Sequence, residues 1–398
     1  MERAVNQMPN VLLSPVGDTD PVRNGYDGPL LHIARHYKPE AVYLFLTAEM
    51  ERREEASGCY SKAVRHILPD CKIDITRSKI EDAHDFDAFQ KPFDELISRI
   101  VKDYPDAEIL VNITSATPQI QSALALEVVS QDARLKAVQV STPVKKSNAD
   151  ISHFNAYKDD IDAALDNDLD SIPGEENRCT EPNIGAFRKT MLKRQIAALL
   201  DSYDYSGAYG VLMGENRALF GDETRELIKH AYYRSRPDNK KAEEAAESLG
   251  KLNKFYLIKD EEIKTVFEYY LITDLKFRRR EYADYYLMVM KIAEHVAKVF
   301  CGIDTTDEKK WFEVRDIVRG RDTAVADMLY KIYEYHEIRN NAAHRLLETD
   351  APPKGYSKHL KELLLKIYGA RVPKGDMKRT LDIYDKINGA ILDAMARE

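Results

Sequence analysis

Near the C-terminal end, the stretch "YHEIRNNAAH" (residues 335–344) places an arginine, two asparagines and a histidine in an otherwise helical pattern. Arg339, Asn340 and His344 are the side chains in it that could do chemistry. Histidine can act as a general acid or base near neutral pH, and arginine can hold a phosphate through paired hydrogen bonds. With asparagine to orient the histidine, these groups suffice for attack of an RNA 2′-hydroxyl on its own phosphate without a metal ion.

The spacing of the three residues limits how they can meet. Residues four apart lie about 40° apart around a helix, so Asn340 and His344 share a face, whereas Arg339 must reach round. The trio would therefore converge more easily at a seam between helices or between two protomers. The same arginine-to-histidine spacing occurs once more in "RELIKH" (residues 225–230), which we interpret as a solvated helix face. The residues between Arg339 and His344 have small side chains that would not compete with them, which favours this stretch over "RELIKH" as the functional match.

Two hydroxyl-rich loops are the second group of candidates. The loop "SPVGDTDPVRNG" begins at Ser14, and the loop "NITSATPQ" begins at Asn112; each follows an apolar stretch typical of a buried strand. In the second loop Thr117 suits the N-cap and Pro118 the first position of a helix, and free N–H groups at a helix start favour a phosphate or another anion. The candidate binding residues are Ser14, Gly17, Asp18, Thr19, Asn112, Thr114, Ser115 and Thr117. Neither GxGxxG nor GxxxxGK[ST] occurs, which argues against a dinucleotide fingerprint and a P-loop.

The elements that must position these loops alternate between strand and helix over the first ~150 residues. Apolar or alternating runs predict strands, and segments of helical periodicity lie between them, so we expect a Rossmann-like α/β domain with a parallel sheet. In such a sheet, ligands bind beyond the carboxyl ends of the strands, where both loops are expected. The expected strands are 11–14, 41–46, 72–76, 108–112 and 136–140, and the expected helices are 29–37, 49–67, 86–101 and 118–129.

The second half of the chain has a different pattern. The acidic segment 159–182, with proline and glycine near its end, is interpreted as a linker or boundary. Beyond it the periodicity is helical almost throughout, which predicts an all-α region. The expected helices there are 186–203, 207–213, 224–233, 241–252, 261–277, 282–300, 323–347, 356–368 and 377–395.

Composition narrows the class of protein. The net charge of −8 gives no global positive field that would mark a nucleic-acid binder, so any RNA contact needs a local basic patch. The runs "KFRRR" (276–280) and "VRDIVRGR" (314–321) could supply one. The four cysteines show no CxxC spacing, which indicates reduced thiols and no zinc site. No run approaches the ~18 apolar residues of a membrane span, so we expect a cytoplasmic protein without a membrane partner.

Taken together, the two loops, the helical region and the Arg-Asn-x3-His stretch resemble the CARF–HEPN ribonucleases of type III CRISPR systems, and among them the Csm-series accessory ribonucleases. The resemblance covers nearly the whole chain. It implies a CARF activator-binding domain over residues 1–172, a helical linker domain over 173–275 and a HEPN ribonuclease bundle over 276–398.

The resemblance also implies roles for the candidate residues. Arg339, Asn340 and His344 would be catalytic, and they would form one composite site across a homodimer. The two loops would bind a cyclic oligoadenylate activator, with cyclic hexaadenylate as the expected ring. The substrate would be single-stranded RNA, the product a 2′,3′-cyclic phosphate, and no metal or other cofactor would be needed. Thr114 is the candidate for slow degradation of the activator.

Two other hypotheses remain open. Asp238, Glu262 and Lys264 superficially satisfy the PD…ExK pattern of a metal-dependent nuclease coupled to a CARF-like sensor, in which carboxylates hold Mg²⁺. However, the segment between them is helical in pattern. A non-enzymatic, nucleotide-responsive regulator is the other alternative, and it predicts that Arg339 and His344 can be replaced without loss of any activity.

Overall fold

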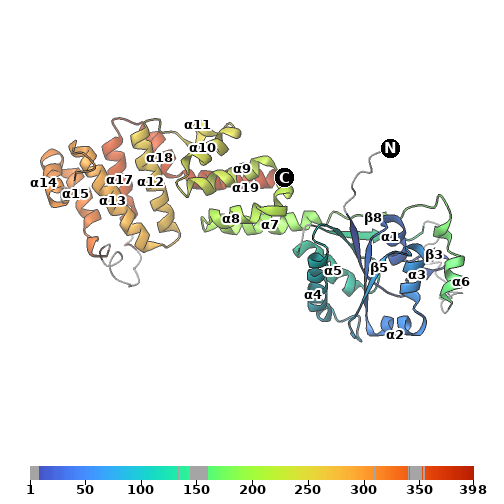
Figure 1. Cartoon of the computed structure of the whole chain (residues 1–398). Coiled ribbons are helices and arrows are strands. Elements are labelled where there is room, and N and C mark those ends of the chain that lie inside the picture. The colour runs from blue at the N-terminus through green and yellow to red at the C-terminus, as the bar shows by residue number, and fades with distance from the viewer. Residues whose placement is uncertain are drawn as a thin grey trace. The chain divides into compact units, whose positions relative to one another are not determined.

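The chain forms two compact units, residues 1–190 and 191–398, in the computed structural model. The structure describes residues 9–131, 134–143, 160–307, 311–338, 340, 352 and 355–398. Figure 1 shows a unit that contains a sheet and a unit built from helices. This bears out the expected order of an α/β domain followed by a helical region. The division into 1–172, 173–275 and 276–398 stays a prediction.

The sheet of the first unit has six strands in the order β5-β4-β1-β6-β7-β8. Neighbouring strands from β5 to β7 pair in parallel, and β8 adds an antiparallel edge. The five expected strands are therefore confirmed. The strands are β1 (Asn10–Pro15), β4 (Ala41–Leu46), β5 (Lys72–Arg77), β6 (Glu108–Asn112), β7 (Leu135–Val140) and β8 (Cys179–Thr180).

Helices cover both faces of this sheet, which explains why its central strands are continuous apolar runs. Leu13 on β1 packs into a core shared with helices α4 and α5, and its neighbour Leu12 packs into a second core shared with α1 and α3. Figure 1 shows these two pairs of helices on opposite sides of the strands. The helices are α1 (Pro29–Tyr37), α2 (Ala48–Ser57), α3 (Cys59–Ile67), α4 (Asp87–Asp103) and α5 (Pro118–Ser130).

The strand order creates a switch point beside β1. From β1 the chain proceeds outward through β4 to β5, and then returns to the other side of β1 as β6 and continues to β7. The loops that follow β1 and β6 therefore leave the same edge of the sheet side by side, where open parallel sheets bind ligands. The first of these loops contains a small hairpin of β2 (Val22–Arg23) and β3 (Tyr26–Asp27).

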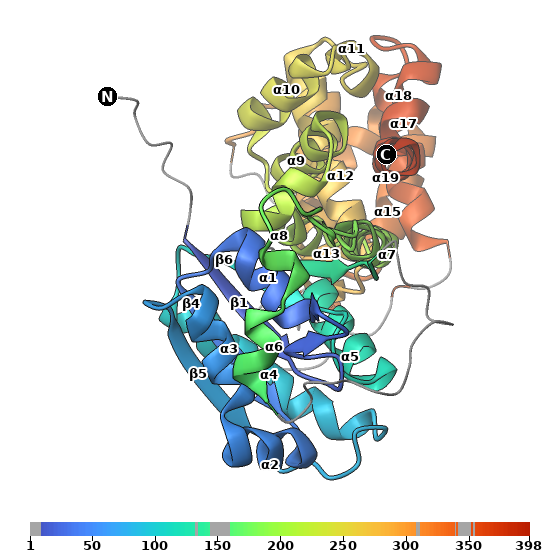
Figure 2. The same cartoon turned by 90° about the vertical axis from the view of Figure 1, so that its right-hand side faces the viewer.

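The interpretation of residues 159–182 as a linker is wrong. Helix α6 (Ile161–Asp166), a short 3-10 turn (Leu169–Ser171) and strand β8 all belong to the first unit. Leu165 is buried in the core beside α3, and Figure 2 shows α6 lying next to that helix. Asp168, Asp170 and Arg178 are buried as well. The acidic composition suggested solvation, but these charges are matched by partners far away in the sequence.

The expected helix 49–67 is two helices. Gly58 ends α2 in a left-handed conformation, with φ of +64°, and its N–H donates to the carbonyl of Glu54. The Glu54 carboxylate in turn accepts a hydrogen bond of 2.9 Å from the N–H of Tyr60 at the start of α3. Glycine adopts positive φ without a steric penalty, so the break is encoded at this position.

The second unit is entirely helical in its described part. Its core is one continuous apolar cluster, in which α13 packs against α12, α14 and α17, and the C-terminal helix α19 returns to pack against α9. No described helix is long and apolar enough to cross a membrane. The principal helices are α7 (Gly185–Asp201), α8 (Tyr205–Leu212), α9 (Asp222–Arg234), α10 (Asn239–Ser248), α11 (Leu252–Phe255), α12 (Glu261–Arg278), α13 (Tyr282–Cys301), α14 (Trp311–Arg321), α15 (Thr323–Tyr333), α17 (Tyr356–Tyr368), α18 (Lys374–Leu381) and α19 (Ile383–Arg397).

Two of the expected helices in this unit are interrupted. The helix expected over 323–347 stops at Tyr333, where α15 ends and a turn follows. The helix expected over 377–395 is divided at Asp382 into α18 and α19. Helix α19 is fixed at its end by Glu398, whose carboxylate accepts hydrogen bonds from the N–H of Gly221 and the hydroxyl of Thr224.

Candidate functional site

Three of the predicted binding residues form a buried link between the two loops. The side-chain amide of Asn112, at the end of β6, donates to the hydroxyl of Ser14 at 2.9 Å and to the hydroxyl of Ser115 at 2.8 Å. Its carbonyl oxygen accepts from the N–H of Thr114 at 2.9 Å. Ser14, Asn112 and Ser115 are fully buried. They therefore shape the edge of the sheet from within, and their polar groups are already satisfied.

Gly17 brings the first loop against the second. A Cβ at this position would lie 2.7 Å from both the N and the Cα of Ala116, so only glycine allows the approach. The N–H of Gly17 donates to the carboxylate of Asp20 at 3.1 Å, and a second oxygen of Asp20 accepts from Leu30 N–H, in the first turn of α1, at 3.0 Å. Burial raises the pKa of Asp20 to about 6 against these hydrogen bonds.

The remaining four predicted residues have different surroundings. Thr19 and Thr114 line a cavity, and the Thr114 hydroxyl also accepts from the N–H of Val140 at 2.9 Å. Asp18 is exposed and forms an ion pair with Arg53. Thr117 caps α5, as its position predicted, and its hydroxyl donates to the carbonyl of Ala83 at 2.6 Å. The structure thus brings the two loops together but directs only part of each toward the cavity.

This cavity has a volume of about 170 Å³ and lies beyond the carboxyl ends of β1, β6 and β7. Most of its lining was missed by sequence reasoning, because it comes from the β2–β3 hairpin, the start of α1, the end of β7 with the residues after it, and Arg178, which directly precedes β8. The sequence offers one signal for this lining: a third expected strand ends at Val140, and a binding loop is also expected after it. The additional lining residues are Arg23, Asn24, Tyr26, Asp27, Gly28, Pro29, Val140, Ser141, Thr142, Pro143 and Arg178.

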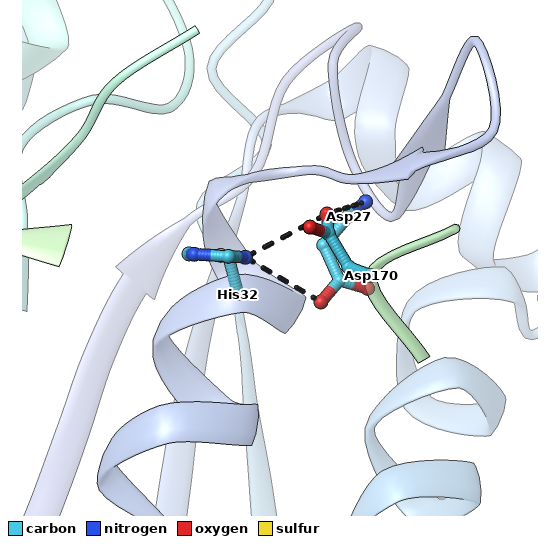
Figure 3. Close-up of side chains that lie close together, drawn as sticks. All are labelled: Asp27, His32 and Asp170. Atoms are coloured by element: carbon cyan, nitrogen blue, oxygen red, sulfur yellow. Dashed lines mark hydrogen bonds and ion pairs between the residues drawn. The ribbon is translucent and has the colours of Figure 1, made fainter. Parts of the chain in front are cut away.

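Below the cavity, a buried charge network joins α1 to the segment 160–181. The carboxylate of Asp170 accepts from the N–H of Asp27 at 2.7 Å and from the guanidinium of Arg178 at 2.6 Å. Nδ1 of His32 lies 3.7 Å from a carboxylate oxygen of Asp27 and 3.7 Å from one of Asp170. Figure 3 shows that both carboxylates face the same edge of the imidazole ring. All three acidic or basic partners of His32 come from different elements. The network therefore fixes the hairpin and β8 against the start of α1.

The second arginine of the network comes from α1 itself. The guanidinium of Arg35 donates to both oxygens of Asp27, at 2.7 and 3.0 Å, and to Asp168 at 2.5 Å. Two arginines thus face three aspartates in a region that is largely removed from water. Such an arrangement leaves one carboxylate without a full countercharge, and burial together with the neighbouring Asp27 raises the pKa of Asp168 to about 7.

The imidazole of His32 is neutral in this arrangement. Its Nε2 accepts a hydrogen bond of 2.9 Å from the N–H of Arg178, so that nitrogen carries no proton. Burial opposes the charged form, whereas the hydrogen bonds to Asp170 and Asp27 raise the pKa of His32. Protonation of Nε2 would set its N–H against the N–H of Arg178, so this hydrogen bond favours the neutral imidazole.

Asp27, His32 and Asp170 are also, in the described part of the chain, the one group of side chains close enough together to hold a metal ion. The guanidinium of Arg178 donates to Asp170 and lies 3.2 Å from Nδ1 of His32, and Arg35 takes both oxygens of Asp27. An ion at this point would have to displace two bound cations. We therefore assign the trio to the charge network.

The charge network predicts a pH dependence of stability. Because the pKa of Asp168 is raised in the folded state, the folded chain binds its proton more tightly than the unfolded chain, so this residue lowers stability as pH rises from about 4 through 7. The variant Asp168→Asn removes this titrating group. The difference in free energy of unfolding between the variant and the parent should therefore favour the variant more at pH 8 than at pH 5, by on the order of 1 kcal/mol. Thermal unfolding of both chains at the two pH values measures the difference.

The matched control for this prediction is Asp166→Asn, which changes an exposed aspartate at the end of α6. Its stability difference from the parent should be the same at pH 5 and pH 8. A difference for Asp168→Asn that does not change with pH would contradict the assignment of the raised pKa.

The predicted catalytic residues fall mostly outside the described part of the chain. Arg339 and His344 lie outside it, and Asn340 is described as an exposed helical residue. Tyr335 and Ile338, just before them, pack against the core of the helical unit. The geometry of the trio therefore stays a prediction.

The run "KFRRR" is mostly neutralised. Lys276 pairs with Glu281 and Asp284, and Arg278 pairs with Asp274 at 2.6 Å and Asp385 at 2.7 Å. Arg279 donates to a backbone carbonyl. In the run "VRDIVRGR", Arg315 pairs with Asp316 and Arg321 donates to the carbonyl of Phe300. Within the described residues, the side chains of Arg280 and Arg319 make neither an ion pair nor a hydrogen bond. These two residues are the cations of the runs that remain available to an RNA phosphate.

The residues of the PD…ExK pattern are separately paired. Asp238 caps α10 and forms an ion pair with Lys241 at 3.1 Å. Glu262 lies 3.3 Å from Arg371, and Lys264 lies 2.7 Å from Glu243. Between them the described chain is helical and contains no strand. The arrangement offers no shared carboxylate site for Mg²⁺ among these residues.

The second arginine–histidine match, "RELIKH", is not a solvated face as a whole. Arg225 is on the surface beside Asp222, but His230 is fully buried and stacks on Phe255, with ring centres 4.8 Å apart. Its Nδ1 donates to the carbonyl of Ala242 at 2.7 Å, and burial lowers its pKa to about 3. This histidine is a neutral core residue.

Comparison with known protein families shows which family the chain belongs to. Residues 70–179 match the model of the Csm6 CARF domain, and residues 182–235 match the model of the Csm6 6H domain of CRISPR-associated proteins. The chain belongs to the Csm6 family. The Csm6 CARF match covers β5 to β8 and so includes Thr114, Ser141 and Arg178 of the cavity.

Individual Csm6 proteins agree with this assignment. The CRISPR system endoribonuclease Csm6 of Enterococcus italicus is 32% identical over 300 residues, covering 73% of this chain and 66% of that protein. The CRISPR system endoribonuclease Csm6 of Mycobacterium tuberculosis is 36% identical over 228 residues, covering 57% of this chain and 54% of that protein. The chain thus spans between about half and just under two thirds of these relatives.

The fold as a whole matches a solved Csm6 structure. Enterococcus italicus Csm6 bound to cyclic hexa-2′-fluoro-hexa-dAMP superimposes with a TM-score of 0.74 and 24% sequence identity, covering 98% of this chain and 100% of that one. At this identity the match establishes the fold: an α/β unit followed by a helical unit in the same order.

Proposed function

We propose that this protein is an endoribonuclease of type III CRISPR defence that cleaves single-stranded RNA when a cyclic oligoadenylate binds its first unit. The observation that carries the proposal is the cavity at the switch point of a Csm6 CARF domain, lined by the loops after β1, β6 and β7. The relatives named endoribonuclease support the proposed cleavage of RNA. The solved Csm6 bound to a cyclic hexanucleotide analogue supports the proposed binding of a ring.

The ribonuclease reaction is proposed to use no metal ion and to take place in a HEPN-type bundle of the helical unit. His344 would take the proton from the RNA 2′-hydroxyl or give one to the departing 5′-oxygen. Arg339 would stabilise the charge that builds on the phosphorane, and Asn340 would position the histidine or the phosphate. The products are a 2′,3′-cyclic phosphate and a 5′-hydroxyl.

Two copies of the chain are proposed to act together. Arg339 and His344 are five positions apart, so on a helix they would point in different directions, and two such stretches facing one another in a homodimer would complete one site. Activation is then a population shift, in which the ring stabilises the arrangement of two CARF domains that aligns the catalytic helices. Thr114, whose hydroxyl is held by Val140 N–H at the cavity wall, is the candidate for slow cleavage of the ring itself.

The test is cleavage of a fluorescent single-stranded RNA in excess EDTA, with and without cyclic hexaadenylate, and in parallel with cyclic tetraadenylate. We expect cleavage that requires a ring and is unchanged by EDTA. This result would also separate the proposal from the metal-dependent alternative, since chelation removes Mg²⁺ and leaves histidine chemistry intact.

The other outcomes have definite meanings. Cleavage that returns only with Mg²⁺ would favour the alternative built on Asp238, Glu262 and Lys264, despite the separate ion pairs of these residues. Binding of a ring without cleavage of any RNA would favour the non-enzymatic regulator.

A further inference from the structure

Arg23, at the edge of the cavity, is a cation without a countercharge among the residues that the structure describes. It lies on β2, opposite Tyr26 of β3, in a hairpin whose turn is formed by Asn24 and Gly25 at φ of 56° and 77°. Positive φ at both turn residues is typical of a type I′ hairpin, which holds its strands in a fixed register. Among the described residues, the Arg23 side chain makes no hydrogen bond or ion pair, although it lines the cavity and is half-buried.

The size of the cavity limits what can enter it. A cavity of about 150 Å³ holds one benzene molecule, so a volume of about 170 Å³ suits one planar base and excludes a whole cyclic oligonucleotide. Its wall carries the hydroxyls of Thr19, Thr114, Ser141 and Thr142. Hydroxyl groups both donate and accept hydrogen bonds, as the edge of an adenine requires.

The cavity also has a positive inner wall. The side chain of Arg178 is 8% exposed and lines the cavity, and its Nε has no hydrogen-bond partner in the described structure. Helix α1 begins at the same wall, with Gly28 as its N-cap and Pro29 as its first residue, but the carboxylate of Asp20 already accepts a hydrogen bond from Leu30 N–H in its first turn. The positive charge of the start of the helix is therefore already met by Asp20, and the charge of the inner wall comes from Arg178.

The acidic residue of the lining does not cancel this charge. Asp27 lines the cavity, but both of its carboxylate oxygens accept hydrogen bonds from Arg35. Asp170, which neutralises Arg178, lies beneath the lining and not in it. Among the described residues that line the cavity, a bound phosphate would thus meet Arg23 without facing an unpaired carboxylate.

We propose that each cavity takes one adenylate unit of the activator, with the base inside and its phosphate on Arg23. This inference rests on the proposed function and adds a residue to it: Arg23 is the phosphate contact, and Arg178 supplies the supporting charge from the inner wall. The remaining nucleotides of the ring lie outside this cavity. The hairpin, and not only the two hydroxyl-rich loops, is therefore part of the activator site.

Calorimetric titration with cyclic hexaadenylate tests the proposal on the full-length chain. Arg23→Gln should bind about tenfold more weakly than the parent, because a charge-assisted contact is lost. Arg23→Lys should lie between the two. The slope of log affinity against log salt should fall by about 0.7 for each arginine that no longer contacts a phosphate. The control is Arg52→Gln, which removes an exposed arginine paired with Glu81 outside the cavity and should change neither quantity.

A double variant tests the role of Arg178 at the inner wall of the cavity. Arg178→Gln alone leaves Asp170 buried without its partner and risks misfolding, so Arg178→Gln is combined with Asp170→Asn. The double variant should also bind the ring more weakly than the parent, because the inner wall of the cavity loses its positive charge. Circular dichroism confirms that each variant is folded before it is titrated.

The outcomes separate this inference from the proposed function. Parental affinity and salt slope in Arg23→Gln would overturn the inference while the ring-activated function stands. If no ring binds, the chain is titrated with adenosine 5′-monophosphate. Binding that depends on Arg23 would keep the nucleotide site but reject the ring as its ligand. If neither probe binds, both the inference about Arg23 and the proposed ring-activated function are rejected.

Discussion

RNA cleavage by the His344→Ala variant should fall by about 10³-fold or more when the activating ring is saturating. The expectation follows from the role proposed for His344, since a positioned general acid or base contributes about 10²- to 10⁴-fold and no other group of the trio can exchange a proton near neutral pH. Affinity for the ring should be unchanged, because the proposed activator site lies in the other unit. Single-turnover cleavage of a fluorescent RNA measures the loss.

The matched control is His336→Ala, which removes an exposed histidine eight positions earlier, whose Nδ1 lies 3.0 Å from the carbonyl of Tyr333. This variant should cleave within about twofold of the parent, as surface substitutions away from a site usually do. If His344→Ala retained ring-dependent cleavage, the catalytic assignment would be wrong, and the non-enzymatic or metal-dependent hypothesis would take its place.

The sheet could be predicted because its signal is local. A strand covered on both faces must be apolar at every position, so β4 (Ala41–Leu46) stands out in the sequence without reference to anything else. Once parallel strands are assumed, the rule for ligand positions leads to the loops after β1 and β6. The strand order then confirms that these loops are neighbours.

The lining of the cavity could not be predicted because it depends on distant pairs. Arg178 reaches the carbonyl of Asp27, 151 positions earlier, and that contact brings β8 to the cavity wall. Sequence shows an acidic segment but not which arginine neutralises it. For the same reason residues 159–182 look like a linker, although burial of Leu165 and pairing of Asp170 make them part of the first unit.

The basic residues of the sequence are also a poor guide to the positive charge at the surface. The run "KFRRR" suggests an RNA-binding patch, yet Arg278 is bound by Asp274 and Asp385, the second of which lies 107 positions away. A cluster of basic residues in the sequence therefore gives no measure of available positive charge. Arg23 is the opposite case. It is an isolated arginine in the sequence, yet the hairpin places it at the cavity, where no described residue compensates its charge.

Breaking the buried ion pair between Arg234 and Glu268 should strongly destabilise the helical unit. Arg234 on α9 is 1% exposed and donates to both carboxylate oxygens of Glu268 on α12, at 2.9 and 2.6 Å. It also donates to the carbonyl of Phe255 and lies 4.3 Å from the centre of the Tyr256 ring. Removal of either partner leaves the other charged, buried and uncompensated.

We therefore expect Arg234→Met and Glu268→Gln each to lower the free energy of unfolding of this unit by about 3–5 kcal/mol. The double variant Arg234→Met with Glu268→Leu should cost much less than the sum, because it buries no unpaired charge. Arg236→Met, which removes an exposed arginine two positions further along, is the control and should cost less than about 1 kcal/mol. Urea denaturation followed by the fluorescence of Trp311, the single tryptophan of the chain, reports on this unit. Additive losses in the double variant would show that packing, and not the pairing of the two charges, holds α9 against α12.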